Sequence, residues 1–352
     1  MSDNGRRILA LGASVGLVAL AFVVRGRADD GDGPGGGGGD GGDRLVCATE
    51  LGDVCDALAD DYDVTVEDAF TTAEQLIGTD SGRAPADLWL APRPWVEAVE
   101  VSRELGGNEP MTGETSDTIA RSPVVLVVQV SRSDTLAGSC GGTITWQCVG
   151  DAADGPWTAV GGQSNWGTVK AGIADPAAGA NLVTLGAAAA DFLDDPGFAS
   201  NDFDGALDNW LAGLAATATA ADRPDAVGEM ITGGAGIMAV LGTVEAEAGP
   251  ALDSDLVQVV VPEPVVTADL VAVPLVDAGG GDSGGGGGGG GGDADDLAGD
   301  GDLLDALAEA GWRVDGRDPA PGIDTGVELP DQGNLPQGDV LWVLLQRWQQ
   351  LV

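Results

Sequence analysis

Short apolar runs and segments with helical spacing alternate through the chain after Arg44. Runs of three to five mainly apolar residues predict three β-strands: Leu45–Ala48, Val64–Val66 and Asp87–Ala91. Apolar residues at intervals of three or four predict helices over Leu51–Asp61 and from Pro94 onward. Strands that alternate with helices in this way form a parallel sheet.

The same pattern indicates where a ligand would lie. Ligands of open α/β sheets bind beyond the carboxyl ends of the strands. Thr49 and Glu50 follow the first predicted strand, and Pro92 and Arg93 follow the third. We therefore expect these four residues at a cleft.

The second half of the chain continues this alternation. Further strands are expected at Ser122–Val130, Thr143–Trp146, Leu256–Val261 and Leu270–Leu275. Helices are expected at Phe203–Ala221, Ala226–Ile231, Leu303–Ala310 and Asp339–Leu351. The last of these is strongly apolar and must dock on the body of the protein.

The segment Thr168–Asp195, TVKAGIADPAAGANLVTLGAAAADFLDD, has a distinct pattern of its own. The run Val169–Ala174 predicts a strand, Asp175-Pro176 ends it, and a loop of small residues leads to an Ala-rich helix with Asn181 as its N-cap. Gly179 would let a ligand or another backbone approach closely. Two interpretations stay open: an ordinary strand-to-helix connection, or a loop whose free N–H groups face a ligand.

A strand that ends in Ala-Asp-Pro, a small-residue loop and an Ala-rich helix resemble the second lobe of extracellular solute-binding proteins of bacterial ABC importers. The nearest branch is the molybdate-like one, with the type II periplasmic-binding fold. The resemblance runs from about Arg44 to the C-terminus and rests on loose patterns. It implies an α/β fold of two lobes with parallel or mixed sheets flanked by helices. Lobe I would span 44–122 plus 268–352 and lobe II 123–267, with the hinge near Ser122-Pro123 and Pro262–Ala268.

The ligand would lie between the lobes, close to the ends of the apolar strands. The expected ligand-binding residues are Thr49, Glu50, Pro92, Arg93, Asp175, Ala178, Gly179, Asn181, Thr232, Gly233 and Gly234. The resemblance suggests an oxyanion, but the molybdate branch has serine hydroxyls where this chain has Thr49-Glu50. A carboxylate repels an oxyanion, so a neutral polar or cationic ligand stays open.

Composition narrows the chemistry. The formal net charge is −42, from 15 basic and 57 acidic residues, so the chain repels nucleic acid and anionic lipid. The absence of histidine excludes Ser-His-Asp and Cys-His catalytic sets and most zinc sites. Tyr62 is the only tyrosine, which excludes a ferric site built on paired tyrosines. We expect a protein that is not an enzyme and uses no cofactor or metal.

The N-terminus predicts export. Arg6-Arg7 precedes a mostly apolar segment, Ile8–Val24, so residues 1–28 are expected to be a signal peptide or an uncleaved membrane anchor. Residues 29–43, rich in Gly and Asp, would be a flexible tether, and 279–292 a disordered glycine-rich insertion. The protein would then work outside the cytoplasm, either anchored through residues 8–24 or secreted.

The four cysteines fall into two pairs of equal spacing. Cys47 and Cys55 are eight residues apart, as are Cys140 and Cys148. In an exported chain, two local disulfides are the natural interpretation, although four cysteines allow three connectivities and free thiols are also possible.

These observations favour a membrane-associated solute-binding protein that delivers a small molecule to the permease subunits of an ABC importer. The alternative is a binding-fold protein that has lost transport and acts as a tethered cell-envelope scaffold or interaction module. An extracellular hydrolase with paired carboxylates is a third class, which the core-like spacing of the tryptophans disfavours.

Overall fold

The computed structural model describes residues 43–78, 82–217, 221, 223, 225–252, 254–277, 293–323, 326–330 and 335–352, all within the unit Gly41–Val352. The predicted export segment 1–28, the tether up to residue 42 and the insertion 279–292 lie outside the described residues. Of the helices in the described ranges, none combines the length and apolar character needed to cross a membrane.

The first half of the sheet confirms the predicted alternation of strands and helices. β1 (Arg44–Ala48) lies between β2 (Asp63–Glu67) and β3 (Leu88–Pro92), and both pairings are parallel. β8 (Thr267–Pro274) lies antiparallel beside β3, which makes the sheet mixed. We call the part built on these strands lobe I.

Three helices connect the strands of lobe I: α2 (Gly52–Asp56), α3 (Ala69–Gly78) and α4 (Arg93–Gly106). α4 has Pro94 in its first turn, as expected. α2 is shorter than the predicted helix Leu51–Asp61 and ends at Asp56. The reason is the charge of the residues that follow. Asp56, Asp60 and Asp61 would place three carboxylates at the negative end of a longer helix dipole.

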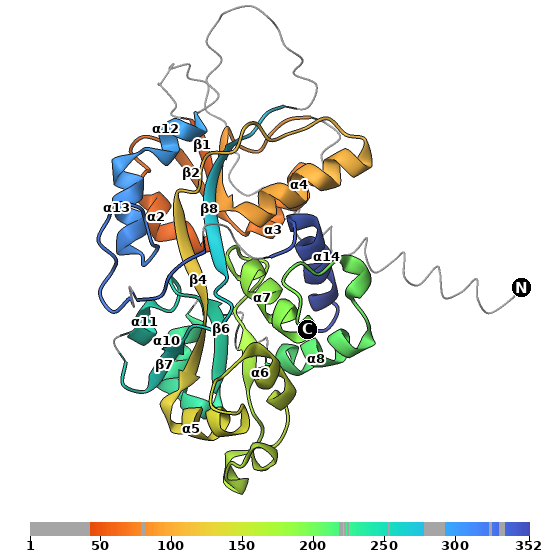
Figure 1. The fold of residues 1–352 in the computed structure, drawn as a ribbon. Helices are drawn as coiled ribbons and strands as arrows, with labels where there is room; N and C mark the ends of the chain where they lie inside the picture. The colour runs from red at the N-terminus through yellow and green to blue at the C-terminus, as the bar shows by residue number, and fades with distance from the viewer. Residues whose placement is uncertain are drawn as a thin grey trace, which may run out of the picture. The chain divides into compact units, whose positions relative to one another are not determined.

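β4 (Ala120–Gln129) joins the two parts of the molecule. Its first four residues pair with β8, whereas Val124–Gln129 pair with β6 (Val240–Val244) and β7 (Val257–Val260). β5 (Ala171–Ile173) lies parallel to β6 at the far edge. We call the part built on β5, β6, β7 and the second half of β4 lobe II. β4 extends from one part to the other (Figure 1) and is buried along nearly its whole length.

Helices cover lobe II, and two of them correct the sequence expectations. The described helices here include α5 (Val130–Ser139), α6 (Trp146–Ala152), α7 (Asn181–Leu193), α8 (Gly205–Ala215), α10 (Ala226–Gly233) and α11 (Gly249–Leu252). The strand expected at Thr143–Trp146 is wrong. The Thr145 hydroxyl instead accepts a hydrogen bond from the Cys148 amide and caps the start of α6. α5 was not predicted, and it begins where the apolar run of β4 ends.

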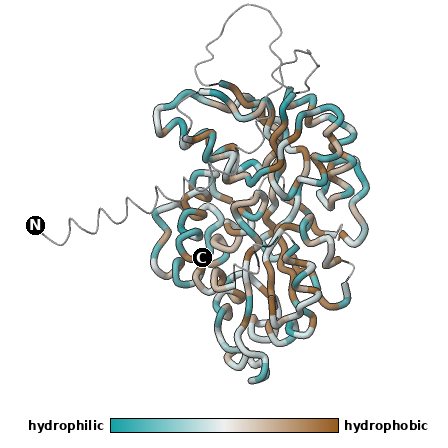
Figure 2. Tube along the Cα trace, turned by 180° about the vertical axis from the view of Figure 1, so that it is seen from behind, coloured by the Kyte–Doolittle hydropathy of each residue, from teal (hydrophilic) through white to brown (hydrophobic). Residues whose placement is uncertain are grey.

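The C-terminal segment returns to lobe I and then spans both lobes. α12 (Ala294–Ala298) and α13 (Gly301–Glu309) lie near β8 and α2. α14 (Gly338–Trp348) packs on α4 of lobe I and on α7 and α8 of lobe II. Its Trp342 ring stacks on Phe70, with 5.1 Å between ring centroids. The apolar residues Leu341, Leu344, Leu345 and Trp348 of α14 are buried, so the docking predicted for this helix is confirmed. Hydrophobic residues also gather along the central strands (Figure 2).

The structure contains both predicted disulfides, Cys47–Cys55 and Cys140–Cys148. The first joins β1 to α2, and the second joins the end of α5 to α6. Each therefore fixes a strand-to-helix or helix-to-helix turn within one lobe.

Candidate functional site

The loop between β5 and α7 lies against lobe I. The amides of Ala69 and Phe70, at the start of α3, donate hydrogen bonds to the carbonyls of Ala178 and Ala177 at 2.8 and 3.1 Å. The Trp95 indole Nε1 donates to the Gly179 carbonyl at 2.8 Å. Three backbone carbonyls of a lobe II loop are thus held by lobe I.

Glu50 of lobe I also contacts this loop. Its Oε1 accepts a hydrogen bond of 2.7 Å from the Ala180 amide, at the start of α7. Its Oε2 is buried and has no hydrogen-bond partner among the residues that the structure describes. A Cβ on Gly179 would lie 2.0 Å from Oε1 and 2.1 Å from Oε2. The absence of a side chain at Gly179 is therefore what admits this carboxyl group.

Asn181 does not cap α7 as expected. Ala180 takes the cap position, without a side-chain hydrogen bond, and Asn181 is the first helical residue. The buried Asn181 Nδ2 donates at 2.8 Å to Oε2 of Glu247, which follows β6. The Thr243 hydroxyl donates to the same oxygen. The amide of Asn181 thus links α7 to the chain beyond β6.

A cavity of about 460 Å³ lies where the ends of β1, β2, β5 and β6 meet. Both lobes contribute to its walls. The lining residues are Thr49, Glu50, Gly52, Asp53, Asp68, Ala174, Asp175, Ala178, Asn181, Ala221, Arg223, Asp225, Ala226, Val227, Leu241, Thr243 and Glu247. Its volume falls in the range of small-molecule sites.

The cavity is electrostatically unusual because its carboxyl groups crowd one another. Burial, followed by the negative charges of Glu247 and Asp68, raises the pKa of Glu50 to about 8. Burial also raises the pKa of Glu247 and of Asp175 above their ordinary values, and neighbouring carboxylates add to both shifts. Across the described ranges, no three Asp, Glu, His or Cys side chains are grouped so as to hold a metal ion.

The structure brings together five of the residues expected at the ligand: Thr49, Glu50, Asp175, Ala178 and Asn181. A sixth, Gly179, lies behind the Glu50 carboxyl group rather than on the cavity wall.

The other five expected residues lie elsewhere. Pro92 is buried, and Arg93 lines a separate cavity of about 620 Å³, where its Nη2 donates to the Thr118 hydroxyl at 3.2 Å. Thr232, Gly233 and Gly234 are at the end of α10, outside the cavity wall. It is the beginning of α10 that reaches the cavity, through Asp225, Ala226 and Val227.

Sequence reasoning missed several lining residues, among them Asp53, Asp68, Asp225, Thr243 and Glu247. Asp68 directly follows β2, so the rule that selected Thr49 and Glu50 after β1 would also have found it. Glu247 lies three residues beyond β6 and reaches the cavity through a turn, a placement that strand ends alone do not reveal.

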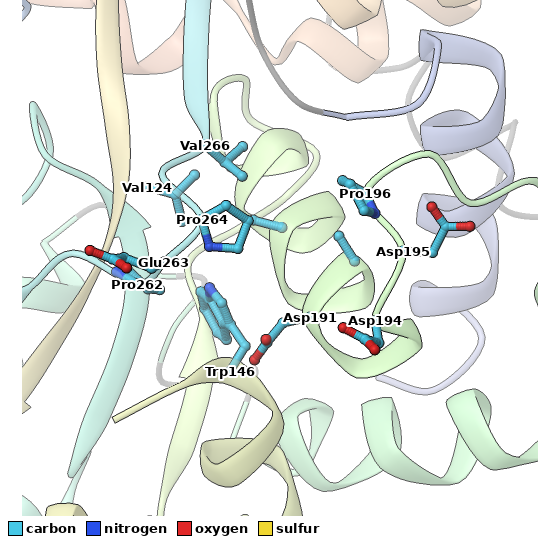
Figure 3. Close-up of a pocket in the computed structure, with 12 residues that line it drawn as sticks. Val124, Trp146, Asp191, Asp194, Asp195, Pro196, Pro262, Glu263, Pro264 and Val266 are labelled. Atoms are coloured by element: carbon cyan, nitrogen blue, oxygen red, sulfur yellow. The ribbon is translucent and has the colours of Figure 1, made fainter. Parts of the chain in front are cut away.

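A smaller hollow of about 120 Å³ lies beside the connection from β7 to β8. Figure 3 shows Trp146 and Pro264 facing each other across it, with Asp191 and Asp194 on the opposite side. Its volume is about a quarter of that of the cavity between the lobes. We take the cavity of about 460 Å³ as the candidate site, because five of the residues expected at the ligand line it and because the Glu50 carboxyl group joins the lobes there.

Comparisons with known proteins give structural likeness alone. No protein-family model matches the sequence, and no curated protein matches it. Among solved structures, the ferric binding protein from Campylobacter jejuni has a TM-score of 0.54 at 7% identity, covering 88% of this chain and 98% of its own.

Two further solved structures are similar over the same extent. Apo FutA2 from Synechocystis PCC6803 has a TM-score of 0.52 at 12% identity and covers 88% of this chain and 98% of its own. The periplasmic binding protein AfuA from Actinobacillus pleuropneumoniae, with fructose-6-phosphate bound, has a TM-score of 0.51 at 13% identity, with coverages of 89% and 98%. The chain therefore has an α/β two-lobe fold of the periplasmic-binding type, with a mixed sheet and flanking helices.

Proposed function

We propose that this protein is a solute-binding protein that works outside the cytoplasm and captures a small polar molecule between its two lobes for an ABC importer. The observation that carries the proposal is the cavity of about 460 Å³, to which both lobes contribute polar side chains. Thr49, Glu50 and Asp68 come from lobe I, whereas Asn181 and Glu247 come from lobe II. A ligand held by both sets would favour closed lobes over open ones.

The domain boundaries are part of the proposal. We place lobe I at 44–122 plus 268–352 and lobe II at 123–267. The exchange of strand partners by β4 after Pro123 supports the first boundary, and the start of β8 at Thr267 supports the second. Anchoring through residues 8–24 and delivery to permease subunits belong to the same proposal, and they agree with the export signal in the sequence.

The solute is better described as polar than as an oxyanion. The molybdate-like branch suggested by the sequence gains no support from the three similar proteins. The start of α7, whose free N–H groups would face a ligand in one of the two sequence interpretations, already donates its Ala180 amide to Glu50. A second anion here would meet the carboxyl groups of Glu50, Asp175 and Glu247.

A second candidate function, a cell-envelope scaffold without transport, is favoured by the contacts between the lobes. α14 packs on helices of both lobes, and the loop Asp175–Ala180 is held to α3 and α4. A binding protein has to open to admit its solute, and these contacts oppose opening. The two candidates differ in whether a solute changes the separation of the lobes.

The test is a thermal-shift screen of the full-length chain against sugars, amino acids, amines and oxyanions, followed by calorimetric titration of each hit. In Ala178→Leu, a larger side chain fills the cavity from the loop, and we expect loss of binding. Ala310→Leu, at an exposed position after α13, is the matched control and should bind normally. Unchanged binding by Ala178→Leu would move the site elsewhere, and a screen without hits would favour the scaffold.

A further inference from the structure

The cavity between the lobes carries a surplus of negative charge that its own residues do not neutralise. Six carboxyl side chains line it: Glu50, Asp53, Asp68, Asp175, Asp225 and Glu247. Arg223 is the basic residue among the described lining residues, and its guanidinium is paired with Glu229. The positive charge of Arg223 is therefore neutralised by Glu229, which does not line the cavity.

Of these six carboxyl groups, Glu50 gives the strongest indication that a ligand binds here. One of its oxygens is used by the Ala180 amide, but the other is buried without a hydrogen-bond partner among the described residues. An unmade hydrogen bond at a buried carboxyl oxygen is costly, and a cationic donor supplied from the cavity would ionise the group and satisfy this oxygen.

The carboxyl groups that line the cavity are of two kinds, which differ in burial. Glu50, Asp175 and Glu247 are half-buried, whereas Asp53, Asp68 and Asp225 are exposed. A molecule with two positive groups would satisfy both kinds. The cavity is large enough for several non-hydrogen atoms, which suits an organic molecule better than a bare ion.

The lining residues also indicate the type of positive group. Quaternary ammonium ions are recognised by aromatic rings, and the described lining residues contain none. A primary or secondary ammonium group instead offers N–H donors, which match carboxylate and threonine oxygens.

We infer that the cavity binds a small organic polyamine, with one ammonium group at Glu50 and Glu247 and a second at the exposed carboxylates. This inference rests on the proposed function, because it names the class of solute captured at the same site. It excludes oxyanions as the principal ligand.

Binding of a polyamine should change the number of protons that the protein holds. With its pKa raised to about 8, the Glu50 carboxyl group is mostly protonated at neutral pH. The groups that face it are Glu247 and Asp68, with Asp175 beyond them, and all three add negative charge. Asp53, Asp225 and the paired Arg223 complete the ionisable lining. A bound ammonium ion lowers these pKa values and releases protons, whereas a bound anion takes protons up.

The experiment is calorimetric titration of the full-length chain with spermidine and with 1,4-diaminobutane, at about 150 mM salt to screen the exposed surface charge. Repeating it in two buffers of different ionisation enthalpy gives the number of protons exchanged. We expect one saturable site per chain, proton release, and affinity that rises as the pH increases toward about 8. Glu50→Gln keeps the shape of the side chain and should weaken binding about tenfold or more while reducing the proton release.

Glu309→Gln is the matched control, because Glu309 is exposed on α13 and lies outside the cavity. It should bind as the unmodified protein does. Equal affinities of the Glu50→Gln and Glu309→Gln proteins for the polyamines would overturn the inference. So would binding at many weak sites that Ala178→Leu does not affect, because both results would show general attraction to an acidic surface.

Titrations with calcium, choline and molybdate separate the remaining outcomes. Tighter binding of any of these than of either polyamine, with loss in Ala178→Leu, would overturn the polyamine inference and leave the proposed function standing. Binding of a neutral solute alone at this cavity would do the same. If no solute of any class binds, the proposed function fails together with the inference.

Discussion

Oε1 of Glu50 lies 2.7 Å from the backbone nitrogen of Ala180 and accepts its hydrogen bond. Glu50 follows β1 in lobe I, and Ala180 begins α7 in lobe II. The chain therefore places its own carboxyl group where the first turn of a helix would attract a ligand anion. This contact joins the lobes and places the Glu50 carboxyl group on the cavity wall.

The first prediction concerns the pH dependence of stability. Burial holds the pKa of Glu50 at about 8 in the folded state, above the ordinary value of 4.5. The folded protein thus keeps a proton that the unfolded chain loses, so the free energy of unfolding should fall as pH rises from about 4.5 to about 8 and then level off. In Glu50→Gln this fall should be smaller by about 1 to 3 kcal/mol, since Glu247 and Asp175 still contribute.

Urea unfolding at several pH values between about 5 and 9 measures this dependence. Glu309→Gln, with the same loss of one exposed carboxylate, should keep the full slope. If both variants follow the unmodified protein, Glu50 is not protonated in the folded state.

The alternation of short apolar runs with segments of helical spacing was sufficient to predict most of lobe I. It identified β1, β3 and the long β4, which are buried strands, and the docking of α14, which is a strongly amphipathic helix. It also identified β2, although this edge strand is largely exposed. It failed at Thr143–Trp146, where four residues are too few to distinguish periods. There the Thr145 hydroxyl caps the first turn of α6 and so favours a helix.

The site was predictable only where it depends on strand ends. Thr49, Glu50 and Asp175 directly follow β1 and β5, and they reach the cavity. Thr232–Gly234 precede β6 in sequence, yet α10 carries them away from the cavity and presents Asp225 instead. The direction of a connecting helix is set by packing between distant segments, which local spacing does not encode.

The second prediction concerns the docking of α14. A Cβ on Gly338 would lie 2.0 Å from the Pro94 carbonyl oxygen and 2.7 Å from the Ala98 nitrogen, both backbone atoms of α4. Gly338→Ala should therefore lower the free energy of unfolding by about 2 kcal/mol or more, because backbone has to move. In the control Gly301→Ala, at the start of α13, the new Cβ meets nothing within 4 Å.

Chemical unfolding of the two variants decides this point. Gly301→Ala should be neutral or stabilise the protein by up to about 1 kcal/mol through the unfolded chain. Equal stabilities of the two variants would mean that α14 docks on α4 less closely than the structure indicates.

The third prediction concerns the ion pair across the hinge. Glu245, directly after β6, accepts hydrogen bonds from Nε and Nη2 of Arg313 at 2.8 and 2.9 Å. The Glu245 side chain is 3% exposed and that of Arg313 is 14% exposed. Arg313 bridges to Arg121 of β4, so the pair ties lobe II to the hinge strand. Glu245→Ala removes the carboxylate from a largely buried ion pair and should destabilise the protein by about 3 kcal/mol.

The double variant Glu245→Leu with Arg313→Met tests this interpretation by replacing both charges with apolar side chains. We expect it to be more stable than Glu245→Ala, because no uncompensated charge is left buried. A double variant as unstable as the single one would indicate that packing, and not charge, is lost.

The last prediction concerns Gly179. From the sequence alone, a larger side chain at this position is expected simply to obstruct the ligand site. The structure gives a different reason for its importance. The three atoms nearest to a Cβ on Gly179 all belong to the Glu50 carboxyl group, at 2.0 to 2.3 Å. Gly179→Ala should therefore displace that group, break its hydrogen bond to Ala180 and destabilise the protein by about 1 to 3 kcal/mol.

A double-mutant cycle with Glu50→Ala isolates this contact. Once the carboxyl group is removed, the methyl group introduced by Gly179→Ala has space, so this substitution should change the stability of the Glu50→Ala protein by less than about 0.5 kcal/mol. The coupling energy between the two positions would then be about as large as the single effect of Gly179→Ala. Additive effects would show that the glycine is needed for the conformation of the loop itself, and that Glu50 approaches it without depending on it.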